Sequence, residues 1–297
     1  MTEITASLVK ELRDRTNAGM MDCKKALNET SGDIEAAIDW LRKKGLANAA
    51  KKAGNITAEG LVSAYIDGNQ GVILEVNSQT DFVAQNQMFQ DFVKSLSKLA
   101  LQVEDIDALK KLSYADGKTV EEELTNLVST IGENLSLRRM KKVISDKKVF
   151  SYIHNASSEG MGKIAVIVAF NGEGSSEAIG KQIAMHIAST KPSALSIESL
   201  DPALVEREKE VQKAKALEEG KPAEIVEKML AGRISKFYQE VCLLEQSFVM
   251  NPDKKVFQVL KEEGVTLVDY AYYILGEGIE KKEEDFAAEV AKVVAGK

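Results

Sequence analysis

The sequence has few of the residues that build most metal and catalytic sites. Its 297 residues include two cysteines, Cys23 and Cys242, and two histidines, His154 and His186. Two cysteines are too few for a disulfide framework or a cysteine-rich zinc site, which favours a reducing compartment. The histidines form neither an HxxxH nor an HxE motif, and no GxSxG motif or pair of base and nucleophile is recognisable. We therefore expect no metal, no cofactor and no enzymatic chemistry, hydrolysis included.

Long apolar runs are also missing. No stretch of 18 apolar residues occurs, so no transmembrane helix is predicted. Residues 1–14 have neither the apolar core of a signal peptide nor the acid-poor composition of a transit peptide. The net charge of −7 argues against sequence-independent nucleic-acid binding by the whole chain. We expect a cytoplasmic protein of two or three domains that binds neither membranes nor, directly, nucleic acid.

Residues 1–54 are predicted to form three short helices. In the first, Ile4, Leu8 and Leu12 recur every four positions, as on one face of a helix. Asp22 is a candidate cap for the second helix, after a turn-rich break.

The third helix is predicted to be capped by the turn that ends at Asp33 and to stop at Gly45. A basic cluster lies near its end, and residues 1–54 are net positive in an acidic protein. The cluster is either a solvated helix end or a docking surface for an acidic partner. It consists of Lys43, Lys44, Lys51 and Lys52.

Two similar units follow, each with a predicted β-hairpin and then a helix. The first has strands at 61–66 and 72–76 and a helix at 87–101; the second has strands at 149–153 and 163–170 and a helix at 176–189. The segment Ser63–Ile66 also matches Phe150–Ile153. We interpret the pair as an internal duplication in which two sheet faces share a core.

Between and after these units the sequence predicts further helices. Residues 120–142 are expected to be helical and to end in a basic group. The stretches 203–219 and 223–238 flank a Gly-Lys-Pro break and are expected to form an antiparallel helical hairpin. Residues 251–271 are expected to return to the core, and 277–297 to form an amphipathic helix. The expected seams of the hairpin are Leu204, Val211 and Ala214 on one arm and Val226, Leu230, Ile234 and Phe237 on the other.

One aromatic residue does not fit a core. Phe82 and Val83 are enclosed by polar residues, between a strand that ends near residue 76 and the helix predicted from residue 87. Asp81 could cap that helix while Phe82 packs beneath it. Alternatively, Phe82 is presented at the tip of the turn as a wedge for a partner.

Five short stretches, in a fixed order along the chain, are distinctive. They are Arg15–Leu27; Asn77–Ala84; Ile131–Asn134 with Arg138 and Arg139; Ile183–Ala188 with Lys191 and Pro192; and Gly276–Lys281. Together they resemble the family of bacterial elongation factors Ts, over essentially the whole chain. The resemblance implies a guanine-nucleotide exchange factor for elongation factor Tu in translation. Such a factor displaces magnesium, promotes GDP release and stays bound until GTP enters.

The resemblance also implies an α+β fold with a division into parts. These are a ubiquitin-associated-like three-helix module at 1–54; a pseudo-duplicated core of antiparallel sheets with helices at 55–148, 149–200 and 239–275; a projecting helical hairpin at 201–238, which could form a homodimer; and a C-terminal helical module at 276–297.

Site residues are implied in the same way. The family's stretch that dislodges magnesium matches Thr80, Asp81, Phe82 and Val83. Residues that match or neighbour partner contacts are Met20, Met21, Lys24, Ile131, Gly132 and His154.

Two other classes of function remain open on the residues alone. A scaffold without exchange activity could use the same helical parts to hold other proteins. An RNA-binding protein could use the lysines near residue 44 and the basic group at 138–142, and its affinity would then depend steeply on salt.

Overall fold

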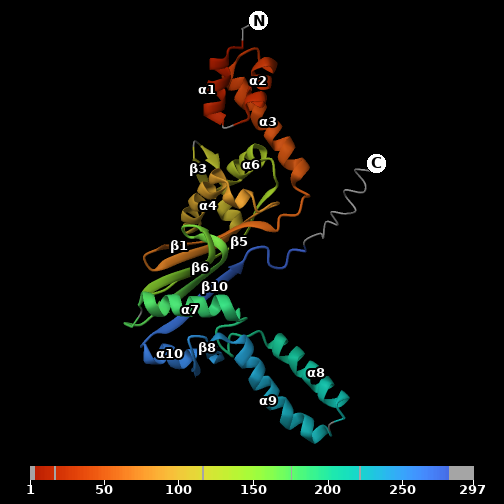
Figure 1. The fold of residues 1–297 in the computed structure, drawn as a ribbon, viewed down its shortest axis with the longest axis vertical. Helices are drawn as coiled ribbons and strands as arrows, with labels where there is room; N and C mark the ends of the chain where they lie inside the picture. Colours follow the sequence, from red (N-terminus) through yellow and green to blue (C-terminus); the bar gives the residue numbers. More distant parts are fainter. Residues whose placement is uncertain (1–3, 17, 116, 175, 221, 281–297) are drawn as a thin grey trace.

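The computed structural model describes residues 4–280 except 17, 116, 175 and 221 (Figure 1). It is an α+β structure in which an antiparallel sheet with covering helices lies between an N-terminal group of helices and a projecting pair of helices. In the part of the chain that is described, no helix combines the length and the apolar character needed to cross a membrane.

The N-terminal group consists of α1 (Ala6–Thr16), α2 (Met20–Glu29) and α3 (Ile34–Lys52). Leu12, Cys23 and Leu27 are fully buried between them. The Asp33 side chain accepts a hydrogen bond from the Ala36 N–H at 2.9 Å and caps α3, as predicted. The three helices therefore form a small core of their own.

Two details of this group were predicted wrongly. Asp22 does not cap α2, because the cap position is Gly19 and Asp22 lies inside the first turn. Gly45 does not end α3, which continues for another two turns. A Cβ at Gly45 would lie 3.4 Å from the Cβ of Ser129 on α6 (Val120–Ile131), so this glycine lies where α3 crosses α6.

Six strands form the central sheet, and all their pairings are antiparallel. The order is β10-β7-β1-β2-β5, and β6 pairs with the other edge of β7. One half consists of β1, β2 and β5, and the other of β6, β7 and β10; they meet where Val62 and Ser63 pair with Gly162 and Met161. The strands are β1 (Glu59–Asp67), β2 (Gln70–Ser78), β5 (Leu135–Ile144), β6 (Lys148–Ser158), β7 (Met161–Asn171) and β10 (Thr266–Ile274).

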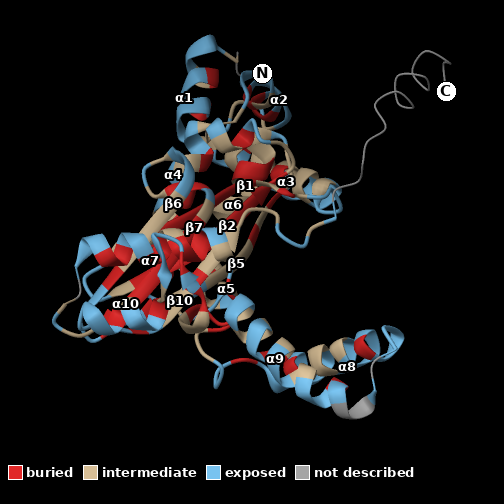
Figure 2. Cartoon of the chain, turned by 60° about the horizontal axis from the view of Figure 1, so that its bottom comes forward, coloured by how far each residue is buried: buried red, intermediate tan, exposed pale blue. Residues whose placement is uncertain are grey.

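The two halves repeat one topology. Each has a hairpin, then a helix, and later a third strand that pairs with the second strand of the hairpin. The helices are α4 (Gln87–Ala100) and α7 (Glu177–Thr190), close to the predicted bounds. Each covers a cluster of buried apolar residues; buried residues are red in Figure 2. The expected order of hairpin and helix is thus confirmed, but within one continuous sheet rather than two.

The predicted helix at 120–142 is wrong in its second part. α6 ends at Ile131 and is capped by Gly132, which has a left-handed φ of +85°; the chain then enters β5. Leu135 and Leu137 are buried and Ser136 between them is not, which is the period of a strand. The basic residues Arg138 and Arg139 therefore lie beside β2 and not on a helix end.

The projecting pair is formed by α8 (Pro202–Glu218) and α9 (Ala223–Val241), which pack against each other (Figure 2). On α9, Val226 and Ile234 are buried as expected. On α8 the expected seam is wrong, because Leu204 and Val211 are exposed. The buried residues there are Val205 and Ala216, and the half-buried Glu208 and Gln212 lie between them on the same face, so polar residues interrupt the stripe.

Short elements complete the described chain, and β10 returns to the sheet as predicted. Residues 281–297, most of the predicted terminal helix, lie outside the described residues. The short elements are the 3-10 turns η1 (Val83–Gln85) and η2 (Leu243–Glu245), the helices α5 (Ile106–Lys111) and α10 (Val256–Glu262), and the strands β3 (Ser113–Ala115), β4 (Lys118–Thr119), β8 (Ser247–Phe248) and β9 (Asn251–Lys255).

Candidate functional site

The turn between β2 and α4 presents an aromatic ring to solvent. The Phe82 residue is 78% exposed, whereas its neighbour Val83 is 4% exposed and belongs to the core cluster under α4. An apolar ring with this exposure gains free energy when a partner covers it, by roughly 1.5–3 kcal/mol for full burial. Of the two interpretations of Phe82, the structure therefore supports presentation and not packing beneath the helix.

The turn is closed by its own hydrogen bonds. The N–H groups of Ala84 and Gln85 donate to the carbonyl oxygens of Asp81 and Phe82 at 3.2 and 3.1 Å. Asp81 is not the helix cap. That position belongs to Asn86, whose Oδ1 accepts hydrogen bonds from the first N–H groups of α4. The prediction missed this cap because either residue has a suitable side chain.

The base of the turn is tied to the loop between α6 and β5. The main-chain N–H and the hydroxyl of Thr80 donate to the two carboxylate oxygens of Glu133, at 2.9 and 2.6 Å. Beside them, the Asn134 N–H donates to Gln79 Oε1 at 2.6 Å. Ile131 and Gly132, the predicted contact residues, directly precede this pair, so the structure brings them next to the Phe82 turn.

The end of α3 reaches the same place. Asn55 donates from Nδ2 to Gln79 Oε1 at 3.2 Å, and its carbonyl oxygen accepts from Asn134 Nδ2 at 2.9 Å. The ammonium group of Lys52 donates to the carbonyl oxygen of Gly132. The N-terminal helices, the Phe82 turn and the α6–β5 loop are therefore joined at one point.

The methionines proposed as contacts lie elsewhere, at the start of α2. Met20 and Met21 are 60% and 75% exposed, and Lys24 is exposed one turn further along. Neither methionine is part of the core of the three helices, so both are free to contact another surface. Two exposed methionines in succession form a flexible apolar patch beside a cation.

His154 lies in the other half of the sheet. It is an exposed residue of β6, opposite Ile164 of β7, and its Nδ1 is 3.0 Å from the hydroxyl of Tyr152. The predicted contact residues thus fall into three groups, on α2, around the Phe82 turn and on β6, and they are not one pocket.

Several of the basic side chains considered for RNA are paired with carboxylates. Lys44 is paired with Asp22, Lys141 with Asp269 at 2.8 Å, and Lys142 with Glu104 at 2.9 Å. Because these charges are already compensated, the groups give little support to a phosphate-binding surface.

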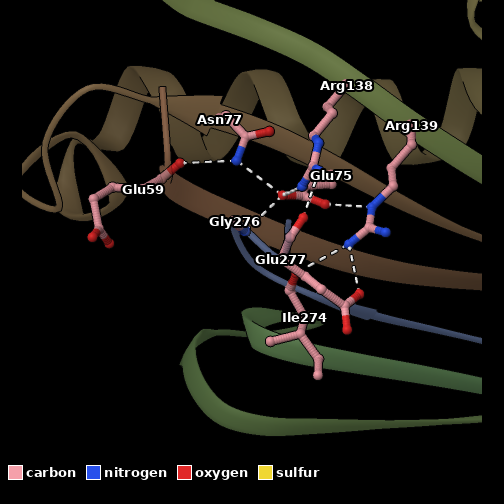
Figure 3. A network of polar contacts seen from close by, with 8 residues as sticks. All are labelled: Glu59, Glu75, Asn77, Arg138, Arg139, Ile274, Gly276 and Glu277. Carbon is pink, nitrogen blue, oxygen red and sulfur yellow. Dashed lines mark hydrogen bonds and ion pairs between the residues drawn. The ribbon is translucent and has the colours of Figure 1, made fainter. Parts of the chain in front are cut away.

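A buried carboxylate that the sequence reasoning missed lies three residues before Ser78 (Figure 3). The side chain of Glu75 is fully buried and accepts hydrogen bonds from Arg138 Nη1 at 2.9 Å and Arg139 Nε at 2.6 Å. Burial alone would raise the pKa of Glu75, but hydrogen bonds from Gly276 and Asn77 and from the two guanidinium groups outweigh it and hold that pKa below its usual value. The signal was a lone charge in an apolar strand, Val-Ile-Leu-Glu-Val.

Among the described residues, no group of three His, Cys, Asp or Glu side chains is placed to hold a metal ion. The arrangement offers an exposed aromatic on a braced turn and separate contact surfaces. Such a set suits binding to another protein better than chemistry on a small molecule.

Comparison with known proteins points the same way. The sequence model of a family described as elongation factor TS matches residues 79–277. A protein of Paracoccus denitrificans named elongation factor Ts is 55% identical over 295 residues, covering 99% of both chains. Proteins of the same name from Dinoroseobacter shibae and Rhizorhabdus wittichii are 57% and 53% identical, covering 99% and 100% of both chains.

Proposed function

The chain belongs to the elongation factor Ts family, and from this premise we propose that it is the guanine-nucleotide exchange factor for elongation factor Tu. It would act in translation elongation, in the cytoplasm, with no catalytic chemistry of its own. The observation that carries the proposal is the Phe82 ring, which is 78% exposed on a turn braced at its base by Glu133.

The proposed mechanism acts on the partner's magnesium ion. Magnesium requires nearly ideal octahedral geometry and bridges nucleotide phosphate to protein oxygens. Phe82 would enter between two helices of the partner and displace one of them by about 1 Å, enough to spoil that geometry. Asp81, together with Thr80 and Val83, would hold the displaced arrangement. Without the ion the phosphate charge is uncompensated, and GDP leaves.

The energy of this step sets what the rest of the chain must supply. A 10³-fold weakening of GDP binding requires about 4 kcal/mol of coupling, and by linkage GDP weakens binding of the factor by the same amount. Phe82 alone supplies roughly 1.5–3 kcal/mol. The remainder would come from other contacts: Met20, Met21 and Lys24 on α2, Ile131 and Gly132 beside the turn, and His154 on β6.

We propose that the parts of the chain divide this work. Residues 1–54 would act as a ubiquitin-associated-like module that docks on the partner's nucleotide-binding domain. The core at 55–148, 149–200 and 239–275 would carry Phe82 and His154, the helices at 201–238 could pair two copies of the chain, and residues 276–297 would form a C-terminal module that adds affinity.

The test is to time GDP release. Elongation factor Tu loaded with a fluorescent GDP derivative and magnesium is mixed with this protein in a stopped-flow instrument. We expect release to accelerate with the concentration of this protein and to approach a maximum. Binding measured by calorimetry without any acceleration of release would indicate a scaffold and contradict the proposed function.

A further inference from the structure

The outer strands of the sheet, β5 and β10, are joined by side chains. In the sheet order β5 pairs with β2, and β10 pairs with β7. Across the gap, Arg139 Nη2 donates to the carbonyl oxygen of Ile274 at 3.0 Å, and Lys141 Nζ donates to that of Tyr270 at 2.8 Å. The two halves of the core therefore meet along a second line, remote in sequence from the first.

Glu75 is the centre of this junction (Figure 3). Besides the two arginines, its Oε1 accepts the main-chain N–H of Gly276 at 2.8 Å. Both arginines also contact Glu277, the residue after Gly276. Arg138 Nη2 donates to the Glu277 carbonyl oxygen at 2.6 Å, and Arg139 Nη2 lies 3.5 Å from the Glu277 carboxylate. The charges of two carboxylates, the buried Glu75 and Glu277, are thus compensated by two guanidinium groups.

The backbone at Gly276 is fixed from the opposite side as well. Its φ is +71°, and a Cβ there would lie 2.3 Å from the carbonyl oxygen of Ala58, just before β1. Glycine is the residue that tolerates both the left-handed backbone and this approach. The Glu277 and Ile279 N–H groups then donate to Ile274 and Gly276 carbonyl oxygens at 3.1 and 3.0 Å.

The same strand that carries Glu75 leads into the Phe82 turn, because β2 ends at Ser78 and Thr80 follows. A buried ionic cluster rarely adds stability beyond what packed apolar side chains would give in its place, and in some proteins such a cluster specifies how the parts that it joins are positioned. Here it relates two parts of the chain, the turn at 79–83 and the segment from Gly276 onward.

We propose that Glu75 is a positioning residue, which fixes the point where the C-terminal segment leaves the core relative to the Phe82 turn. The inference rests on the proposed function. With the departure point fixed, binding of the turn places the terminal segment at a high effective concentration near its own contact on the partner. A variant in which this departure point is no longer fixed binds elongation factor Tu with lower affinity, but Phe82 acts as in the wild type once the complex has formed.

The experiment measures GDP release from elongation factor Tu against the concentration of full-length Glu75→Gln. The half-saturating concentration is expected to rise about tenfold through the lower effective concentration, with the maximal rate unchanged. The control is Glu104→Gln, the same substitution at an exposed carboxylate paired with Lys142 of β5; it should match the wild type. A wild-type half-saturating concentration in Glu75→Gln, or a fall in maximal rate alone, would overturn the proposal.

A second arm tests whether the effect travels through the terminal segment. Glu75→Gln is combined in the full chain with Phe286→Ala and Val290→Ala, two apolar residues four positions apart in the amphipathic helix that the sequence predicts at 277–297. The rise in half-saturating concentration should then be much smaller than in the wild-type background, because the contact is already weakened. An equal rise in both backgrounds would show that Glu75 acts elsewhere. Should Glu75→Gln not fold, Arg138→Lys replaces it in both arms, because it keeps the charge but loses the guanidinium group that donates to both Glu75 and the Glu277 carbonyl oxygen.

Amide hydrogen exchange of the free protein separates this inference from the proposed function. The N–H groups of Gly276, Glu277 and Ile279 should exchange faster in Glu75→Gln, while those of β7 stay protected. Unchanged exchange there would contradict the positioning role. Failure of the wild type to accelerate GDP release would contradict the proposed function and leave this local result to stand on its own.

Discussion

Thr80 and Glu133 are 53 positions apart, yet both donors of Thr80, the main-chain N–H and the hydroxyl, meet the carboxylate of Glu133. The acceptor belongs to the loop that follows α6, and the donors belong to the turn that carries Phe82. The turn is therefore held by a distant part of the chain as well as by its own hydrogen bonds. Charge-assisted hydrogen bonds of this kind are about twice as strong as neutral ones.

The first prediction concerns this clamp. Glu133→Ala leaves two donors of Thr80 without their acceptor, at a cost of about 1–3 kcal/mol in the free energy of unfolding. Because the turn loses its fixed position, we expect the maximal rate of GDP release to fall by about tenfold, which corresponds to 1.4 kcal/mol. Stopped-flow measurement of release and urea denaturation check the two effects.

Two variants control that experiment. Glu121→Ala, at an exposed glutamate of α6 itself, should leave the release rate unchanged. Thr80→Val combined with Glu133→Ala should cost little more than either substitution alone, since both remove the same interaction. Full activity of Glu133→Ala would show that the clamp does not position the ring.

The second prediction concerns the ring itself. Phe82→Ala should leave the free energy of unfolding within about 0.5 kcal/mol of the wild type, because the residue is 78% exposed. It should nevertheless slow GDP release strongly, while calorimetry still detects partner binding through the other contacts. Phe257→Ala, at a 41% exposed phenylalanine on α10, is the control and should change neither GDP release nor partner binding. Release at the wild-type rate in Phe82→Ala would remove the wedge from the mechanism.

The third prediction concerns pH. His186 is buried, its Nε2 is 2.8 Å from Gln246 Oε1, and its Nδ1 accepts the Val249 N–H at 3.2 Å. Burial lowers the pKa of His186 and outweighs the opposing effect of Gln246. The unfolded chain therefore takes up a proton near pH 6.5 that the native chain does not, and stability falls as pH decreases below that value, by up to about 1.4 kcal/mol per pH unit.

Urea denaturation between pH 8 and 5.5 measures this slope. His186→Asn should lose most of it, whatever the overall stability of the variant. His154→Asn, which removes the other histidine of the sequence, an exposed one, should keep the slope. A slope that survives in His186→Asn would assign the proton uptake to another group.

The sequence could predict the elements that are determined by residues close together in the chain. The N-terminal helices, the two hairpins and α4 follow from apolar periodicity and turn residues within about 15 positions. β5 was mistaken for helix because long basic side chains are common at a helix end. The actual partner of Arg139 is Glu75, which lies 64 positions earlier in the sequence. The sequence singled out Phe82 but left open whether its ring is packed beneath the helix or presented to a partner. It did not indicate the Glu133 clamp, because pairings at such separations depend on the assembled fold.

The last prediction concerns two glycines inside helices, Gly45 and Gly180. Helix propensity alone predicts that alanine stabilises the protein at both positions, whereas packing predicts stabilisation at Gly45 and destabilisation at Gly180. Replacing either by alanine should favour the helix by up to about 1 kcal/mol. At Gly45 a Cβ would lie 3.4 Å from the Cβ and Oγ of Ser129, close to ordinary contact. At Gly180 it would lie 2.3 Å from the Phe150 ring, which packs against Phe170.

Gly45→Ala is therefore expected to raise the free energy of unfolding by about 0.5–1 kcal/mol, and Gly180→Ala to lower it by about 1–3 kcal/mol through overpacking. Urea denaturation of both variants, compared at equal m values, checks the signs. Phe150→Leu in the Gly180→Ala background should recover part of the loss, because the smaller side chain makes room for the new methyl group. Changes of the same sign in both glycine variants would mean that helix propensity, and not the contacts with Ser129 and Phe150, decides the effect of these positions.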